Sequence, residues 1–193
     1  MLSEQHPLQP FLPASARVLM LGSFPPPRVR WSMEFYYPNP QNDMWRVVGY
    51  LATGDKNHFL LPDRRRFDQP RIEAFCRERG IALYDTSEEI IRLKGNASDA
   101  SLQVVREVDL EALLARIPDC RTIVVTGGKA ADTLCRITGC ALPGVGEWSP
   151  AHYAGRELKI WRMPSTSRAF PRPIEWKAEF YRRPLIDVGI LGE

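Results

Sequence analysis

The sequence predicts an α/β protein in which helices cover both faces of a central four-stranded, mainly parallel sheet. Three observations support this prediction. Short apolar runs rich in Val, Ile and Leu recur along the chain, helical patterns lie between them, and glycine or proline marks many of the boundaries. Strands that alternate with helices usually pair in parallel, and a parallel sheet needs cover on both faces.

The four expected strands are distributed along the whole chain. RVLMLG, RTIVVTG and ELKIWRM are apolar runs with the length of a buried strand, and IALY is a weaker fourth candidate. They span residues 17–22, 81–84, 121–127 and 157–163.

Helices are expected between and after these strands. The first has Trp45 and Val48 on one side, and the second has Phe67 and Ile72 in a similar stripe. The third follows Asp109, a suitable N-cap residue, and the fourth follows a Gly-Gly turn. The expected helices span residues 42–51, 64–79, 110–117, 129–137 and 173–182.

Length and composition are typical of a globular protein. The chain has 193 residues, 44% of them hydrophobic, so it is long enough for one buried core, and a single domain over residues 1–193 is expected. A net charge of +3 permits contact with a polyanion but does not require it. We find no signal segment and no run long enough to span a bilayer, which predicts a cytoplasmic protein without membrane contact.

The cysteines and histidines do not indicate metal or redox chemistry. No two cysteines have CxxC spacing, so free thiols in a reducing compartment are expected. The histidines lack ligand-like spacing, and nucleotide-binding glycine motifs are absent, so neither a metal nor a cofactor is expected. The residues concerned are Cys76, Cys120, Cys135, Cys140, His6, His58 and His152.

The loops that follow the strands are the expected functional region. In a parallel sheet, ligands sit beyond the carboxyl ends of the strands. SFPPPR, DTS, TGGKA and PSTSRAF follow the four strands, and the aromatic, proline-rich loop YYPNPQNDMW lies just beyond the first of these segments. Four loops should therefore meet at one mouth.

Two of these loops also have a plain structural interpretation. TGGKA is either a simple strand-to-helix turn or an anion site built from backbone N–H groups. MPSTSRAF is either a Ser/Thr turn or a loop whose hydroxyls grip phosphate oxygens. In the second case an arginine or aromatic at its tip would fill the gap left by an extruded base.

Five segments in the same order and rough spacing resemble the uracil-DNA glycosylase superfamily. They are LGSFPPPRV, YYPNPQNDMWRVV, GIALYDTSEEIIRLKGNASDASL, VVTGGKA and MPSTSRAF, within residues 17–182. The resemblance is greatest to the mismatch-specific uracil/thymine branch and its hypoxanthine-DNA relatives. It implies the three-layer fold of that superfamily and a monomeric, monofunctional DNA N-glycosylase without a cofactor, whose partner is DNA that contains a damaged or mismatched base.

The resemblance also implies which residues form the site. Ser23, Phe24 and Tyr37 correspond to base-binding positions, with the rings of Phe24 and Tyr37 on the two faces of the base. The usual water-positioning asparagine of the first motif is replaced by Phe24, so Asn42 is expected to take that duty. Asp85 corresponds to a second catalytic position facing the base.

The last motif is the expected DNA-binding loop. Ser165, Thr166, Ser167 and Arg168 correspond to the loop that enters the minor groove, with Arg168 or Phe170 as the wedge. Other arginines are candidates for phosphate contacts, although about half of such residues in any chain are solvated surface. They are Arg28, Arg30, Arg64–Arg66 and Arg172.

Several alternatives are open at this point. Asp85 can act as an anion that accepts a base N–H or activates water, or as a neutral acid that donates to a carbonyl. The whole protein can be an active glycosylase, a catalytically silent member that binds nucleic acid or a nucleobase, or an unrelated small-molecule-binding α/β protein.

Overall fold

The computed structural model describes residues 2–93 and 101–192, and the stretch 94–100 of the motif GIALYDTSEEIIRLKGNASDASL lies outside these ranges. A five-stranded sheet has the order β3-β2-β6-β8-β7. Four of its strands are parallel and β7 runs antiparallel at the edge. The strands are β2 (Val18–Gly22), β3 (Ile81–Asp85), β6 (Thr122–Thr126), β7 (Trp148–Tyr153) and β8 (Arg156–Met163).

The parallel α/β architecture confirms the predicted fold class, and the four predicted strands are all present. The sheet has five strands and not the four expected, since it also contains β7, which was not predicted. Its sequence WSPAHY contains Pro150 and its burial alternates, features that fit an edge strand and not a buried one. Pro150 lies opposite Lys159 on β8, and no strand of the described residues pairs with the other side of β7.

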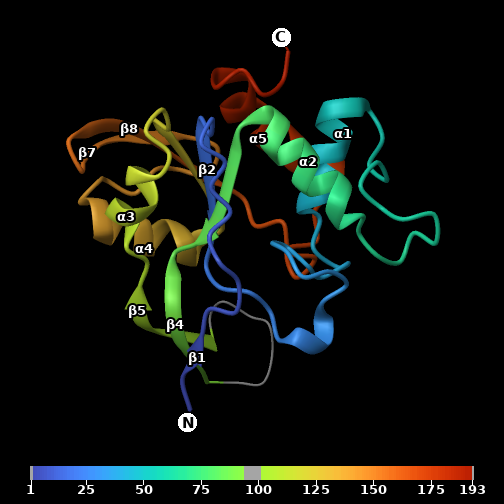
Figure 1. The fold of residues 1–193 in the computed structure, drawn as a ribbon, viewed down its shortest axis with the longest axis horizontal. Coiled ribbons are helices and arrows are strands. Elements are labelled where there is room, and N and C mark those ends of the chain that lie inside the picture. The colour runs from blue at the N-terminus through green and yellow to red at the C-terminus, as the bar shows by residue number, and fades with distance from the viewer. Residues whose placement is uncertain (1, 94–100, 193) are drawn as a thin grey trace.

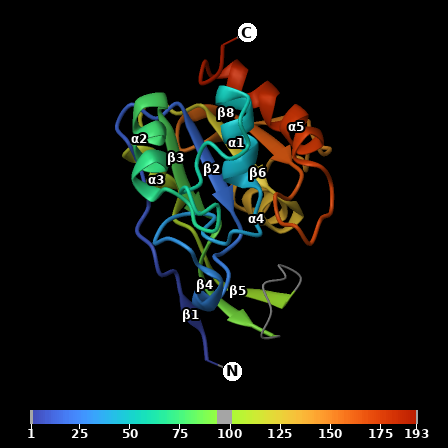
Figure 2. The same ribbon diagram turned by 90° about the vertical axis from the view of Figure 1, so that its right-hand side faces the viewer.

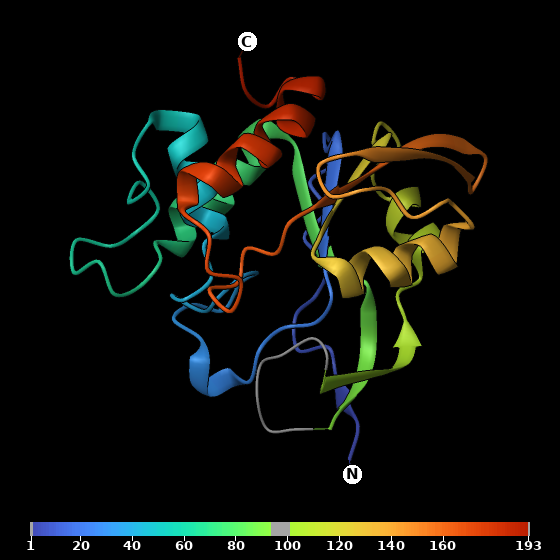
Figure 3. The ribbon, with the colours of Figure 1, turned by 180° about the vertical axis from the view of Figure 1, so that it is seen from behind.

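Helices cover both faces of this sheet, as predicted. On one face lie α1 (Met44–Thr53), α2 (Gln69–Arg79) and α5 (Ile174–Asp187), and on the other lie α3 (Leu110–Ala115) and α4 (Gly128–Thr138) (Figures 1 and 3). The chain moves from β2 to β3 in one direction and later to β6 and β8 in the opposite direction. Right-handed crossovers in opposite directions place their helices on opposite faces, which explains the three layers.

Helix α2 begins at Gln69, whereas its apolar pattern predicted a start at residue 64. It starts at Gln69, after Asp68, whose side chain accepts the N–H of Arg71, and Pro70 occupies the first turn. The residues before it form a turn in which Arg64 has a φ of 54°. Phe67 is buried in this turn and pairs with Leu60 instead of belonging to the helix.

A second, antiparallel sheet was not predicted. Its strands have the order β1-β4-β5, and it lies beyond the carboxyl ends of the main strands (Figure 2). They are β1 (Glu4–Gln5), β4 (Ser87–Arg92) and β5 (Leu102–Glu107). Charged and polar side chains are the majority in these strands, so their apolar pattern is weak. Within the described ranges, Ile90 and Leu102 form a small core with Phe24.

The main strands carry the core and fix the position of the loops. Every residue of β2, β3 and β6 is buried, as expected for strands covered on both faces. Since β2 lies between β3 and β6, the chain departs to opposite sides of it, and such a switch point opens a crevice at the carboxyl ends of the strands.

Candidate active site

A cavity of about 100 Å³ lies at this switch point. A single water needs only about 10–15 Å³ on this measure, so the cavity has room for a much larger group. The wall includes eight of the predicted site residues: Ser23, Phe24, Tyr37, Asn42, Asp85, Ser165, Thr166 and Ser167. Arg168 does not line it. Segments far apart in the sequence therefore meet at one site, while the roles assigned to these residues stay predictions.

Asp85 is the carboxyl group of this cavity, and its partner is a histidine from the N-terminal segment. Asp85 is the last residue of β3. Its side chain is 9% exposed, and the side chain of His6 is 3% exposed. Asp85 Oδ2 lies 2.8 Å from His6 Nε2. Asp85 Oδ1 packs against Gly22, where a Cβ atom would lie 2.5 Å from that oxygen, so any other residue at this position would displace the carboxyl group.

The pair can carry its shared proton on either atom. His6 Nδ1 lies 2.9 Å from the carbonyl oxygen of Leu8 and 3.2 Å from its backbone nitrogen. While Nδ1–H donates to Leu8 O, the shared proton can lie on a neutral Asp85 that donates to Nε2, or on Nε2, which then donates to an ionised Asp85. A neutral ring protonated only on Nε2 accepts from Leu8 N–H instead. Either way the buried carboxyl group keeps a hydrogen-bond partner.

Sequence reasoning missed His6 as a site residue. It is separated from Asp85 by 79 positions, and strand β1 brings it to the site by pairing with β4, directly after Asp85 and Thr86. No local motif marks it. The only sequence signal is a polar, proline-rich N-terminal segment, which gives no hint of a partner.

Tyr37 has a strained backbone in the cavity wall. Its φ is 52°, a value rare for a bulky residue, which costs about 1–3 kcal/mol and persists only because the surrounding structure holds it. Its hydroxyl lies 3.2 Å from Thr126 Oγ1 at the end of β6, and its ring meets Trp45 edge-on at 6.2 Å. Strained residues of this kind cluster at functional sites. Here the contacts with Thr126 and Trp45 hold the strained residue and its aromatic ring at the cavity.

Two further tyrosines lie near Asp85: Tyr36 in the cavity wall and Tyr84 next to Asp85 on β3. Tyr36 is buried and donates from its hydroxyl to Gln9 O at 2.7 Å. Burial, and then the charge of Asp85, raises the pKa of Tyr36 well above its ordinary value. Burial, Glu88 and Asp85 raise the pKa of Tyr84 to about 12. Both phenols therefore stay neutral beside the carboxyl group at neutral pH.

Asn42 occupies the cavity rim at the beginning of α1. Its Oδ1 accepts the backbone N–H of Met44 at 2.9 Å, and its backbone forms a bridge with Ser167 of the loop after β8. The side chain thus serves the helix N-terminus as well as the cavity. The amide NH₂ group and the second lone pair of Oδ1 are the parts that can serve a ligand.

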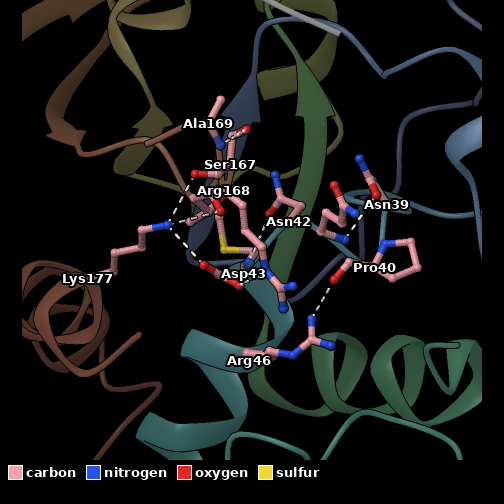
Figure 4. Close-up of polar contacts among 12 residues, drawn as sticks. Asn39, Pro40, Asn42, Asp43, Arg46, Ser167, Arg168, Ala169 and Lys177 are labelled. Carbon is pink, nitrogen blue, oxygen red and sulfur yellow. Dashed lines mark hydrogen bonds and ion pairs between the residues drawn. The ribbon is translucent and has the colours of Figure 1, made fainter. Parts of the chain in front are cut away.

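A buried ion pair fastens the loop after β8 to α1 (Figure 4). Lys177 of α5 is fully buried, and its Nζ donates to Asp43 Oδ2 at 3.0 Å and to Ser167 O at 3.2 Å. Asp43 also accepts from Arg168 Nε at 3.1 Å, and its backbone N–H donates to Thr166 O at 2.8 Å. Sequence reasoning missed this lysine because a single lysine in a helix usually indicates a solvated face.

Within this loop the Ser/Thr-turn interpretation accounts for two hydroxyls. Ser165 Oγ accepts the N–H of Ser167, and Ser167 Oγ accepts the N–H of Ala169, both at 3.2 Å. The predicted wedge residues are also engaged. Arg168 is bound to Asp43, and the 37% exposed ring of Phe170 lies 5.9 Å from that of Trp176.

The TGGKA segment forms the turn between β6 and α4. Gly127 has a φ of 94°, which suits glycine, and its N–H donates to Met163 O at 3.0 Å. That N–H is therefore used inside the fold and does not serve an anion, while both interpretations of the segment stay predictions.

The described part of the chain has neither a metal-binding cluster nor a membrane-spanning helix. Residues 2–93 and 101–192 contain no cluster of three or more His, Cys, Asp or Glu side chains suited to a metal ion. Across the same two ranges no helix has both the length and the apolar character needed to cross a bilayer.

The fold and cavity define a parallel α/β protein with a ligand-sized crevice at the sheet's switch point. No protein-family model matches the sequence, and no curated protein matches it significantly. Among solved structures, the chain is similar to the solution NMR structure of a candidate uracil DNA glycosylase from Methanosarcina acetivorans. The TM-score is 0.58, with 24% sequence identity over 91% of this chain and 96% of that chain. The two chains therefore share a fold.

Proposed function

We propose that the protein is a DNA glycosylase that turns a damaged or mismatched base out of DNA and hydrolyses its N-glycosidic bond with water. The observation that carries this proposal is the single cavity that unites an aromatic ring (Tyr37), a carboxyl group (Asp85) and an amide (Asn42) at the carboxyl edge of the sheet. The shared fold with a candidate uracil DNA glycosylase supports it.

The cavity has the groups that such a reaction requires. Breaking the bond develops positive charge on the sugar and negative charge on the departing base. Catalysis then needs a partly closed site, hydrogen-bond donors for the base and one oriented water. The Asn42 amide can donate to the base edge, and Asp85, held by His6, can accept a base N–H or orient the water.

The aromatic rings can compensate for taking the base out of the duplex. Extrusion costs a few kcal/mol in lost stacking and pairing. Stacking on a protein ring returns about 1–3 kcal/mol for each base. Tyr37 and Phe24 both line the cavity, and Phe24 is backed by Ile90 and Leu102 of the second sheet. In our proposal these rings bind the two faces of the base.

The experiment is a panel of labelled oligonucleotides that carry uracil, a G·T mismatch, hypoxanthine or xanthine, each as duplex and as single strand. Alkali cleavage of the product reveals abasic sites. We expect abasic sites for at least one lesion, and their loss in Asp85→Asn and Tyr37→Ala. If the purified wild-type protein binds these DNAs but forms no abasic site with any lesion, it is not a glycosylase for them.

A second candidate function is binding of a lesion without excision. Two observations favour it: Phe24 stands where the first motif usually has asparagine, and Asn42 Oδ1 is already used by the Met44 N–H. This candidate predicts lesion-selective, salt-sensitive DNA binding with no base release. The same panel, with binding measured alongside cleavage, separates the two functions.

A further inference from the structure

An exposed valine stands on a rigid turn beside the cavity. Val29 is the middle residue of the short 3-10 helix η1 (Arg28–Arg30), and its side chain is 92% exposed. Among the large apolar side chains in the described part of the chain, only Leu2 is more exposed. Scattered exposed apolar residues are common, so this exposure needs further support before it suggests a function.

The first support is that the turn is held rigidly. Three prolines, residues 25–27, precede it and restrict the backbone. The indole Nε1 of Trp31 donates to Pro26 O at 2.7 Å, closing the turn from behind. Arg28 stacks over the Trp31 ring at 4.7 Å and donates to both carboxylate oxygens of Glu34 at 2.6 Å. Val29 therefore projects from a preorganised support.

The second support is its position relative to the cavity. A surface depression lined by Val29, Arg30 and Trp31 also includes Asn39 and Gln41, and the latter two line the cavity as well. The depression is thus continuous with the cavity rim. In the ribbon views η1 projects at the same end of the molecule as the carboxyl ends of the strands (Figures 1 and 3).

The third support is charge. Arg28 and Arg30 flank the apolar tip, and among the described residues no ion pair is found for Arg30. A cation beside an exposed apolar tip suits a polyanion whose interior is apolar, which describes a DNA duplex. Proteins that open a duplex commonly insert an apolar side chain between base steps while cationic side chains hold the phosphates.

We infer that Val29 is the wedge that enters the base stack when the target nucleotide turns out into the cavity, with Arg30 on a neighbouring phosphate. This inference rests on the proposed function. It places the wedge on the turn η1 and not on the loop after β8, where Arg168 is bound to Asp43 and Phe170 lies against Trp176.

The test compares excision of one lesion from a duplex and from a single strand under single-turnover conditions. A wedge is needed only where a stack must be opened, so Val29→Ser should lose roughly tenfold or more in rate on the duplex. The same variant should keep the wild-type rate on the single strand. Val29→Leu, which retains an apolar tip, should keep most of the duplex rate. Val145→Ser, at an exposed valine outside the cavity wall, is the matched control and should change neither.

A second readout separates this inference from the proposed function. Fluorescence of 2-aminopurine placed next to the lesion reports opening of the stack whether or not the base is excised. If the wild type opens the stack without excision and Val29→Ser does not open it, the wedge is correct and the glycosylase proposal fails. If Val29→Ser opens the stack and excises from the duplex like the wild type, Val29 is not the wedge. The same conclusion follows if its excision rates on the duplex and the single strand fall by the same factor.

Discussion

At the scale of single residues, the Asn42 side chain has two tasks that one substitution would confuse. Its Oδ1 accepts the Met44 N–H at the start of α1, and its amide faces the cavity. Removing the side chain therefore removes both a helix contact and a possible ligand contact. Any loss of activity in an alanine variant must be separated from a loss of stability.

Asn42→Ala and Asn42→Ser together separate these tasks. We expect Asn42→Ala to abolish excision, to leave DNA binding nearly intact and to lower the free energy of unfolding by about 1 kcal/mol. Serine keeps an oxygen that can accept the Met44 N–H, so Asn42→Ser should regain stability but not excision. Denaturant unfolding and abasic-site formation are the two measurements. Base release by Asn42→Ala at the wild-type rate would remove Asn42 from the mechanism.

His6 is the second residue whose replacement is informative, because it is the hydrogen-bond partner of the buried Asp85 carboxyl group. We expect His6→Ala to leave that group without its partner, to cost about 1–3 kcal/mol of stability and to reduce excision. His6→Gln keeps a side-chain amide that can both donate and accept, and should restore much of both properties. His152→Ala is the control, since His152 pairs with Glu157 at an exposed site. Unaltered excision in His6→Ala would show that the pair is only structural.

At the scale of secondary structure elements, the Asp43–Lys177 pair joins three pieces: α1, α5 and the loop between β8 and α5. The pair is buried, so neither charge is well solvated if its partner is lost. Both Asn42 and Ser167 lie next to it in the chain or in contact with it. A change at Lys177 should therefore reach the cavity rim.

We expect Lys177→Met to lower the free energy of unfolding by about 3–5 kcal/mol, the usual cost of removing one partner from a buried pair. The loss should lie at the lower end, because Arg168 still contacts Asp43. Lys159→Met, at an exposed pair with Asp187, should cost less than about 1 kcal/mol. Adding Asp43→Asn to Lys177→Met should recover part of the loss, and additive losses would contradict the pairing.

The elements themselves differ in how well sequence predicts them. The runs of β2, β3 and β6 are mostly apolar and buried at every residue because helices cover both faces, so single-sequence patterns suffice for them. β8 mixes apolar and charged residues, but its run of Leu158, Ile160 and Trp161 is buried and still indicates a strand. The small second sheet has charged strands whose stability depends on pairing with distant segments, such as Arg92 with Glu4. That information does not exist in any local window. Helix α2 begins at Gln69, later than residue 64 as predicted, for a related reason: Phe67 is buried through the pairing of its turn with Leu60 and does not belong to the helix.

At the scale of the whole molecule, the loops that follow the four predicted strands meet at one cavity, as the sequence predicted. They do so because parallel strands direct their carboxyl ends to one edge of the sheet. What sequence could not supply were the partners that hold those loops. His6 reaches Asp85 from the N-terminal segment, and Lys177 reaches Asp43 from the last helix. Both contacts join residues with no pattern between them, so only the assembled fold reveals them.

The buried phenols near Asp85 give the molecule a specific response to alkali. Tyr84 has a pKa of about 12 in the folded state, raised chiefly by burial, and the pKa of Tyr36 is raised further by burial and Asp85. Unfolded tyrosine titrates near pH 10. Between these values the folded state keeps protons that the unfolded state releases, so the stability present below about pH 10 must fall as pH rises toward 12. Burial also raises the pKa of Cys120 to about 11, which acts in the same direction.

We therefore expect the free energy of unfolding, measured in urea, to be lower at about pH 11 than at about pH 8, with a decline that steepens above about pH 10. Tyr84→Phe should make the decline shallower, since one of the groups with a raised pKa is gone. Because Tyr36 and Tyr84 both contact the His6 ring, at centroid distances of 6.3 and 4.6 Å, ionising either phenol places a charge beside the Asp85 pair. Since the folded state keeps both phenols neutral up to about pH 12, excision should follow the folded fraction as pH rises, and loss of excision well below the pH of unfolding would contradict this coupling.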